Sequence, residues 1–268
     1  MIRFILLAAN RSGTNFFRSV VSCHPDVHMF GEILFYDYEF LPDREENFYV
    51  QWLRAVQKDP SQITYRNMYA CAQRFIASNF ESMARMKAVG MDIKYDFWDR
   101  LPFVASYFLR NPPKVIHLVR HNTLRMHISA FLLTCRNHGV ERGTLPIHEY
   151  DGFVRTGEHQ VEVHICKPLL ETFIHLEYRK QRFRDIASKF EHIEISYEDI
   201  VGPTQQSVST FPPPVAEKVF GFLGVAHDVP GLVADMEKVS PPALRDIVDN
   251  YDDLCANLRS LGLERYID

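Results

Sequence analysis

The sequence predicts an α/β fold in which helices cover both faces of a central, mostly parallel sheet. Three observations support this prediction. Short apolar runs alternate along the chain with amphipathic stretches of helical period. The apolar runs are continuous, as in strands that are buried on both faces. Two of them end in polar, arginine-containing turns that lead into helices. We interpret 1–268 as a single domain, because no repeat or convincing linker divides the chain.

Four segments have the apolar pattern of strands. The clearest is 114–119, and the others span 4–8, 88–94 and 192–197. We interpret the N-terminal run as a buried strand rather than a short signal peptide, because Asn10 and Arg11 interrupt it.

Helices are expected between and after these strands. The first follows the turn at 10–13 and ends before Pro25, because proline disfavours helical backbone in the residue that precedes it. Further helices are expected within 44–88 and at 123–133, 171–190, 216–223 and 244–261. The glycine-containing stretch 136–165 is expected to be a long functional loop, and the proline-rich stretch 202–214 another loop.

Composition excludes several classes of protein. The formal net charge is −4, so no global basic field points to a nucleic-acid partner. The 5 cysteines are scattered without a C-x-x-C pair, which indicates neither a disulfide framework nor a zinc site. No stretch reaches the length of a membrane span. We therefore expect a cytoplasmic protein with reduced thiols and no metal.

The turn Asn10-Arg11-Ser12-Gly13-Thr14-Asn15 lies between a predicted strand and a predicted helix. Backbone N–H groups at a helix N-terminus are unpaired and favour an anion. Gly13 permits close approach of the backbone, and Arg11 adds a positive charge. The turn is not a Walker A sequence, because it has no G-x-x-x-x-G-K-[ST] pattern. A simple helix cap beside a surface arginine is the alternative.

A second polar turn follows the clearest strand. Arg120 comes directly after this strand, where ligands of parallel sheets bind, and Arg125 and Ser129 follow on the next helix. An arginine paired with a surface carboxylate is the alternative. Both turns would attract an anionic ligand at the same edge of the sheet.

Together, the Arg-Ser-Gly-Thr turn, His24-Pro25, Gly31-Glu32, Arg120 and Ser129 resemble sulfotransferases that use 3′-phosphoadenosine 5′-phosphosulfate (PAPS). The resemblance is closest to the tyrosylprotein and bacterial carbohydrate or glycolipid branch. It covers 4–34 and 114–133 well, and it implies a P-loop-like three-layer α/β/α fold.

The resemblance also implies roles for particular residues. The phosphosulfate loop would comprise Arg11, Ser12, Gly13, Thr14 and Asn15. Arg120 and Ser129 would bind the 3′-phosphate, Tyr197 would lie near the nucleotide, and Lys238 or Ser240 would cover it. Asn15 stands where a second threonine is common. The interval from Arg120 to Ser129 is one residue longer than in many members, so Arg125 is an alternative partner.

Glu32 occupies the position of the glutamate base in this branch, and a carboxylate can accept the proton of an acceptor hydroxyl. Lys94 would lie close to the transferring sulfuryl group, where it would stabilise charge, or it would be an ordinary strand-end lysine in solvent. His24 is a weaker candidate for the base, since its place at a helix end suggests packing or capping.

The acceptor stays open among carbohydrates, glycolipids, peptide tyrosines and small natural products, as do O- versus N-sulfation and the oligomeric state. We expect the acceptor pocket to be built from 33–75 and 136–165, the stretches that match the family least. Two other functions compete with sulfuryl transfer. One is a kinase-like phosphotransfer from ATP, and the other is non-catalytic nucleotide binding.

Overall fold

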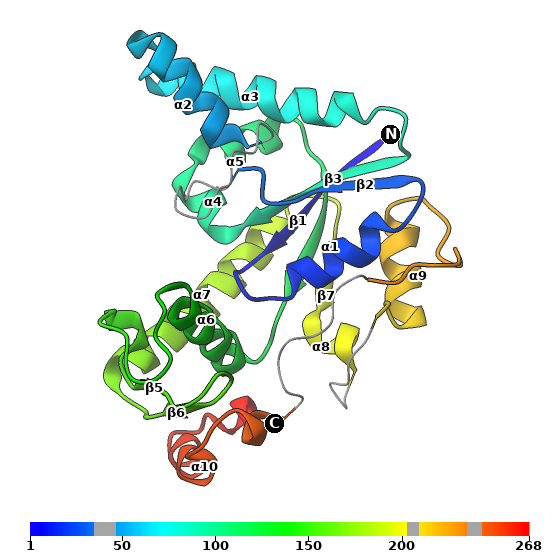
Figure 1. Ribbon diagram of the computed structural model, residues 1–268. Helices are drawn as coiled ribbons and strands as arrows, with labels where there is room; N and C mark the ends of the chain where they lie inside the picture. The colour runs from blue at the N-terminus through cyan, green and yellow to red at the C-terminus, as the bar shows by residue number, and fades with distance from the viewer. Residues whose placement is uncertain (35–46, 203–208, 235–242, 268) are drawn as a thin grey trace.

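The computed structural model describes residues 1–34, 47–202, 209–234 and 243–267. Its centre is a five-stranded parallel sheet with the strand order β2-β3-β1-β4-β7. The strands are β1 (Ile2–Ala8), β2 (Val27–Phe30), β3 (Ala88–Lys94), β4 (Lys114–Val119) and β7 (His192–Ser196). The expected P-loop-like three-layer α/β/α arrangement is confirmed, with helices on both sides of the sheet (Figure 1).

The side chains of β1 show why both faces of the sheet are covered. Phe4 and Leu6 pack into one apolar cluster, and Ile5 and Leu7 pack into the other. All four are fully buried. Phe4 also pairs with Gly90 on β3, where an added Cβ would lie 2.2 Å from the Phe4 ring. Glycine at this position therefore lets a large aromatic ring fill the space above the neighbouring strand.

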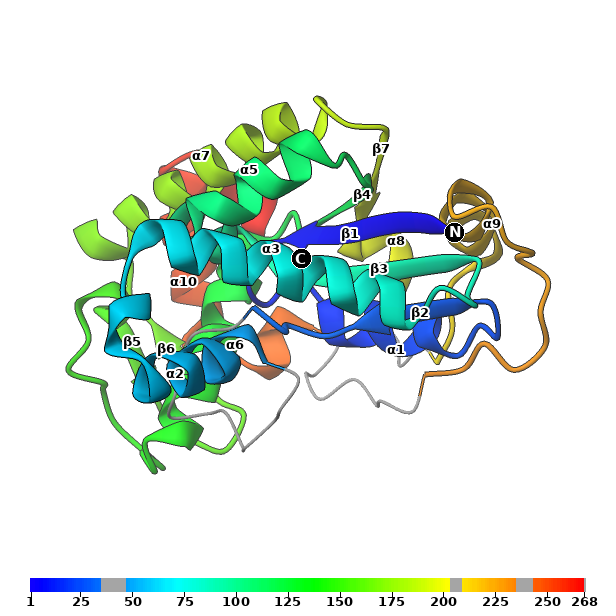
Figure 2. The same cartoon turned by 90° about the horizontal axis from the view of Figure 1, so that it is seen from above.

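Each of these two clusters joins one face of the sheet to its own helices. Figure 2 gives a second view of the helices around the sheet. The first contains side chains of α2 (Phe48–Lys58), α3 (Tyr65–Ser82), α4 (Tyr95–Arg100), α5 (Pro102–Arg110) and α7 (Lys167–Ala187). The second contains side chains of α1 (Thr14–Ser22), α8 (Tyr197–Val201) and α9 (Pro213–Phe222).

A third apolar cluster lies beyond the carboxyl ends of β1 and β4 (Figure 1). It joins α6 (Thr123–Asn137), the 3₁₀ turn η3 (His148–Tyr150), the hairpin β5 (Phe153–Arg155) and β6 (Val161–Val163), and α10 (Tyr251–Ser260). The other 3₁₀ turns among the described residues are η2 (Pro60–Gln62), η4 (Leu244–Asp246) and η5 (Glu264–Tyr266).

Several local expectations are wrong. The stretch 136–165 is not one long loop, because β5 and β6 pair antiparallel within it. The last strand ends at Ser196, since Ser196 and Asp199 form a capping box that starts α8 at Tyr197. The helix expected from 244 begins only at Tyr251. In addition, β2, α4 and α5 were not foreseen.

Candidate active site

The turn after β1 brings polar groups to the N-terminus of α1. Arg11 and Gly13 both have positive φ, at 65° and 88°. A Cβ on Gly13 would lie 2.5 Å from the ring of Tyr197, so this approach requires glycine. Helix α1 begins at Thr14 with no acidic residue in its first turn and no side-chain cap. Its exposed N–H groups are therefore available to an anion.

Arg120 approaches this turn from the end of β4 and is 7% exposed. Its Nη1 donates to the carbonyl of Arg11 at 3.1 Å. Its guanidinium carbon lies 4.5 Å from the centre of the Tyr197 ring. Arg120 Nε and the hydroxyl of Ser12 are both buried without a hydrogen-bond partner. Unsatisfied buried donors are costly, so two such groups beside one turn indicate that a polar ligand completes the site.

Arg11 and Ser129 meet across the turn. The Nε and Nη2 atoms of Arg11 donate to the Ser129 hydroxyl at 3.0 and 2.8 Å. Partial desolvation and then repulsion from Arg120 lower the pKa of Arg11, although its side chain keeps contact with solvent. Ser129 therefore positions the arginine of the turn, and any phosphate that Ser129 binds would also lie beside Arg11.

Arg125 lies on the same helix as Ser129 but faces a cavity of about 190 Å³ that Arg120 also lines. Arg125 is 4% exposed. Burial, and then repulsion from Arg120, lower its pKa to about 10. Two arginines that repel each other at the wall of one cavity favour a ligand of negative charge.

Arg265 is a third arginine on this cavity, and sequence reasoning missed it. It comes from η5 near the end of the chain. Its Nη2 donates to the hydroxyl of Tyr266 at 2.7 Å, and its guanidinium carbon lies 4.8 Å from the centre of that ring. No local motif marks Arg265. Only the tertiary fold brings it to Arg120 and Arg125.

A polar cluster fastens this C-terminal turn to the rest of the site. The Tyr266 hydroxyl donates to Glu177 Oε1 at 3.0 Å, and Asn122 donates to the Tyr266 carbonyl at 3.0 Å. Lys180 and Thr123 also donate to Glu177 Oε1. These bonds tie the turn to α7 and to the start of α6, next to Arg120.

Glu198 stabilises the segment that carries Arg120. Its carboxylate accepts the backbone N–H of His121 at 3.0 Å and that of Asn122 at 3.2 Å. Asn122 in turn caps α6 by accepting the N–H of Arg125 at 3.0 Å. The first turn of α8 thus fixes the start of α6, and with it the direction of both arginines.

Glu32 and Lys94 lie together on the other side of the α1 N-terminus. Lys94 Nζ is 3.3 Å from Glu32 Oε1 and 2.8 Å from an oxygen of Asp92, and it also donates to the Thr14 hydroxyl. Lys94 is 3% exposed, so the alternative of an ordinary strand-end lysine in solvent is wrong. Asp92, which is fully buried, was missed because it stands inside a strand.

Burial raises the pKa of Glu32, the charge of Lys94 opposes this shift, and the charge of Asp92 adds to it. The Glu32 side chain is 30% exposed, so it remains reachable from solvent. A carboxylate of this kind is a suitable proton acceptor, because its pKa lies closer to neutral pH than that of a free glutamate.

The two most notable histidines have structural partners. His24 Nδ1 accepts the N–H of Asp26 at 3.1 Å, so Nε2 carries the proton that bonds the Ala226 carbonyl at 2.9 Å. His117 lies between the Tyr95 hydroxyl and Glu194. His24 thus packs at the helix end.

The sequence also predicts that Lys238 or Ser240 covers the nucleotide. Both residues lie outside the described residues.

In the described ranges, no helix is long and apolar enough to cross a membrane. The same part of the chain holds no group of three or more His, Cys, Asp or Glu side chains placed to bind a metal ion.

Comparison with known proteins does not show the family of this chain. No family model matches the chain, and a search of curated proteins gives no match. Among solved structures, the chain is similar to a sulfotransferase from Alicyclobacillus acidocaldarius. The two are 16% identical with a TM-score of 0.48, and the alignment covers 100% of this chain and 97% of the other. A proposal for the function therefore rests on the geometry of the site.

Proposed function

We propose that the protein is a sulfotransferase that moves a sulfuryl group from PAPS to an acceptor hydroxyl, or alternatively to an amine. The observation that carries this proposal is a pair of buried, unsatisfied hydrogen-bond donors, one of them on an arginine, beside the α1 N-terminus. Ser12 Oγ and Arg120 Nε are buried without partners. They lie beside a helix end that favours anions and within reach of a carboxylate and lysine pair.

The residues present suit the two anionic groups of PAPS. The loop from Arg11 to Asn15 would hold the 5′-phosphosulfate with backbone N–H groups and the Ser12 and Thr14 hydroxyls. The cavity lined by Arg120 and Arg125 would hold the 3′-phosphate. Ser129 would assist through Arg11, and Tyr197 would form the wall between the two subsites.

The transfer itself needs little from the protein beyond position and charge. PAPS supplies an activated sulfuryl group whose bridging oxygen leaves on PAP (3′-phosphoadenosine 5′-phosphate). Lys94 would stabilise the negative charge that grows on the leaving oxygen. Glu32 would take the proton of the attacking hydroxyl. Asp92 would hold Lys94 in place, since both of its oxygens accept from Lys94 Nζ.

The acceptor classes left open by the sequence are a carbohydrate, a glycolipid, a peptide tyrosine and a small natural product. We further propose a cytoplasmic location and no bound metal. The 5 cysteines are all unpaired, which suits a reducing compartment.

The proposal is tested by incubating the purified protein with PAPS, and separately with ATP and magnesium, together with a mixed panel of acceptors. We expect sulfated product and PAP from PAPS alone. Phosphorylated product from ATP would support a kinase-like enzyme instead. Tight PAP binding without turnover of either donor on any acceptor would support a non-catalytic nucleotide-binding protein.

A further inference from the structure

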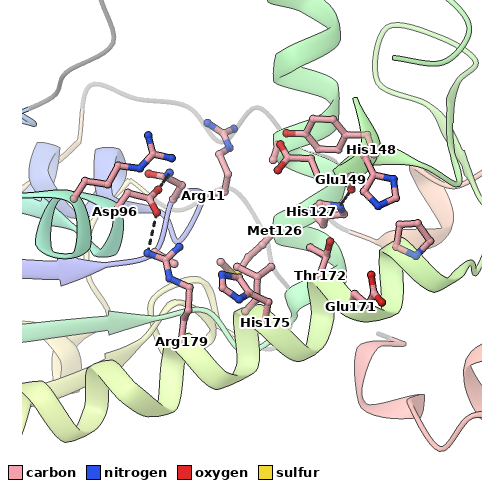
Figure 3. Close-up of a pocket in the computed structure, with 17 residues that line it drawn as sticks. Arg11, Asp96, Met126, His127, His148, Glu149, Glu171, Thr172, His175 and Arg179 are labelled. Carbon is pink, nitrogen blue, oxygen red and sulfur yellow. Dashed lines mark hydrogen bonds and ion pairs between the residues drawn. The ribbon is translucent and has the colours of Figure 1, made fainter. Parts of the chain in front are cut away.

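A larger cavity of about 640 Å³ opens beside the turn after β1, on the side of α6 and α7 (Figure 3). Arg11 belongs both to this cavity and to the turn that would hold the phosphosulfate. The pKa of Arg11 also responds to Tyr150, on the wall of the cavity, and to Glu32. Arg11 therefore connects the cavity to the turn assigned to the phosphosulfate.

The walls of this cavity are held in place by polar contacts. Arg179 on α7 lies 2.8 Å from Asp96 on α4, and Asn10 donates to Asp96 at 2.9 Å. On the opposite side, the ring of His127 bonds the Glu149 carbonyl at 2.7 Å. The first two contacts tie the turn and α7 to α4, and the third ties α6 to η3. The cavity is thus a built site and not a gap between loops.

Most side chains that line the cavity are polar. Figure 3 shows Glu171, Thr172 and His175 on α7, facing His148 and Glu149 across the opening. Among the described residues of the lining there is neither phenylalanine nor tryptophan. A site for a phenol or a polycyclic acceptor would be lined mainly by apolar and aromatic side chains. The many charged and polar side chains of this lining therefore favour a polar acceptor over a mainly apolar one.

The charges of the lining are balanced. The arginines are Arg11, Arg100 and Arg179, and the carboxylates are Asp96, Glu149 and Glu171. A balanced set gives no net attraction to an anionic or a cationic acceptor. It does offer donors and acceptors together, because arginine donates, carboxylate accepts and histidine does both. Each hydroxyl of a sugar is likewise a donor and an acceptor.

We infer that this cavity binds the acceptor, and that the acceptor is a neutral, polyhydroxylated molecule such as an oligosaccharide or the sugar part of a glycolipid. The inference rests on the proposed function. The reacting hydroxyl extends past Arg11, its oxygen bonds to sulfur, and the bond from sulfur to the phosphate oxygen breaks. The electron pair of that bond leaves with PAP, and the hydroxyl proton passes to Glu32.

The test uses radiolabelled PAPS with three neutral disaccharides (lactose, maltose and trehalose) and with 2-naphthol as an apolar probe. We expect label in at least one disaccharide and none above background in 2-naphthol. Thr172→Phe fills the cavity and should raise the KM for that disaccharide about tenfold or more, a loss of about 1.4 kcal/mol. His175→Phe, at an exposed position of the same face, should act likewise if Thr172→Phe fails to fold.

Ile174→Phe is the matched control, because Ile174 lies on the same helix, is 70% exposed and is not part of the lining. It should leave the KM unchanged, and none of the three variants should change PAP affinity in calorimetry. Transfer to 2-naphthol alone, transfer to none of the disaccharides, or an unchanged KM in both cavity variants would overturn the inference. Absence of PAP binding in the parent protein would instead reject the proposed function.

Discussion

The three arginines Arg11, Arg120 and Arg125 carry the same charge but make different contacts in the site. Arg11 contacts Ser129, Arg120 contacts the Arg11 carbonyl, and Arg125 lines the smaller cavity. Burial lowers the pKa of Arg120, as it does for Arg125. Burying like charges near one another is costly without an anion. Substituting these arginines should therefore change ligand affinity more than it changes the free energy of unfolding.

Glu32→Gln should lower turnover by on the order of 10²–10⁴ while PAPS affinity stays nearly unchanged. Glutamine keeps the size and one acceptor oxygen but cannot take a proton. Steady-state kinetics and calorimetry on the same preparation measure the two effects. Glu217→Gln, at an exposed position of α9, is the control. Turnover within a few-fold of the parent would mean that another group accepts the proton.

The pH dependence of turnover gives an independent check on Glu32. The base must be unprotonated, so activity should fall as the pH drops through its pKa. Because burial raises the pKa of Glu32, the midpoint should lie above the value of about 4.3 for a free glutamate. A pH profile of kcat/KM measures it. A midpoint at or below about 4.3 would count against Glu32 as a buried base.

Arg265→Ala should weaken PAP binding about tenfold and leave adenosine 5′-phosphosulfate nearly unaffected, because the latter lacks the 3′-phosphate. A charge-assisted hydrogen bond is worth roughly 1.5–3 kcal/mol, reduced here because Arg265 is exposed. Arg259→Ala, on the exposed side of α10, is the matched control for charge. Equal weakening of both ligands by Arg265→Ala would place Arg265 elsewhere than on the 3′-phosphate.

Site residues that belong to a sequence motif could be predicted. Residues that only the tertiary fold brings to the site could not. Arg11, Gly13 and Arg120 flank strand ends, where parallel sheets bind ligands, so their place follows from local pattern. Arg265 and Asp92 carry no such pattern. Ser129 and Arg125 stay alternatives in the sequence because one turn of helix separates them, and only the packing of α6 shows that Arg125 lines the smaller cavity while Ser129 contacts Arg11.

The C-terminal turn η5 is joined to the site by hydrogen bonds and contributes a side chain to it. Tyr266 is 1% exposed and connects η5 to Glu177 on α7 and to Asn122 before α6. The same turn carries Arg265 to the smaller cavity. The position of Arg265 on the smaller cavity therefore depends on the hydrogen bonds that Tyr266 makes with Glu177 and Asn122.

Tyr266→Phe should lower the free energy of unfolding by about 1 kcal/mol and weaken PAP binding a few-fold, because it removes a buried hydrogen bond that fixes η5. Chemical denaturation and calorimetry measure the two quantities. Tyr251→Phe, on the neighbouring helix α10, is the control for loss of a tyrosine hydroxyl. PAP affinity equal to that of the parent would show that η5 does not position the site.

Elements with strong periodicity were predicted, and short ones were not. The long apolar run of β4 and the helix α6 are close to their expected bounds. Strand β2 has four residues, and β5 and β6 have three each, too few for an alternating pattern to stand out. Strand β2 forms because it pairs with β3, and β5 and β6 form because they pair with each other and pack into the third apolar cluster. Most of these partners lie far from the strands in the sequence, so the local pattern does not reveal them.

Across the described chain, the candidate site lies where the third apolar cluster meets the carboxyl edge of the sheet. Ala9 and Met126, which belong to a sheet cluster, and Tyr150, which belongs to the third cluster, line the same cavity. The cavity includes 148–150 from the stretch expected to bind the acceptor. None of its described lining residues comes from 33–75, and α7 contributes instead. The interpretation of 1–268 as a single domain stays a prediction.

The junction between the third apolar cluster and the carboxyl edge of the sheet should bind a nucleotide with phosphate groups at both its 3′ and 5′ positions, without a metal. Isothermal titration of PAP in the presence of a chelator tests it most directly, with Arg120→Ala alongside. We predict tight binding to the parent that weakens with salt, since phosphate contacts are electrostatic. Arg120→Ala should weaken PAP by roughly 1.5–3 kcal/mol and adenosine 5′-phosphosulfate far less. No PAP binding by the parent, or binding only with magnesium, would contradict the account.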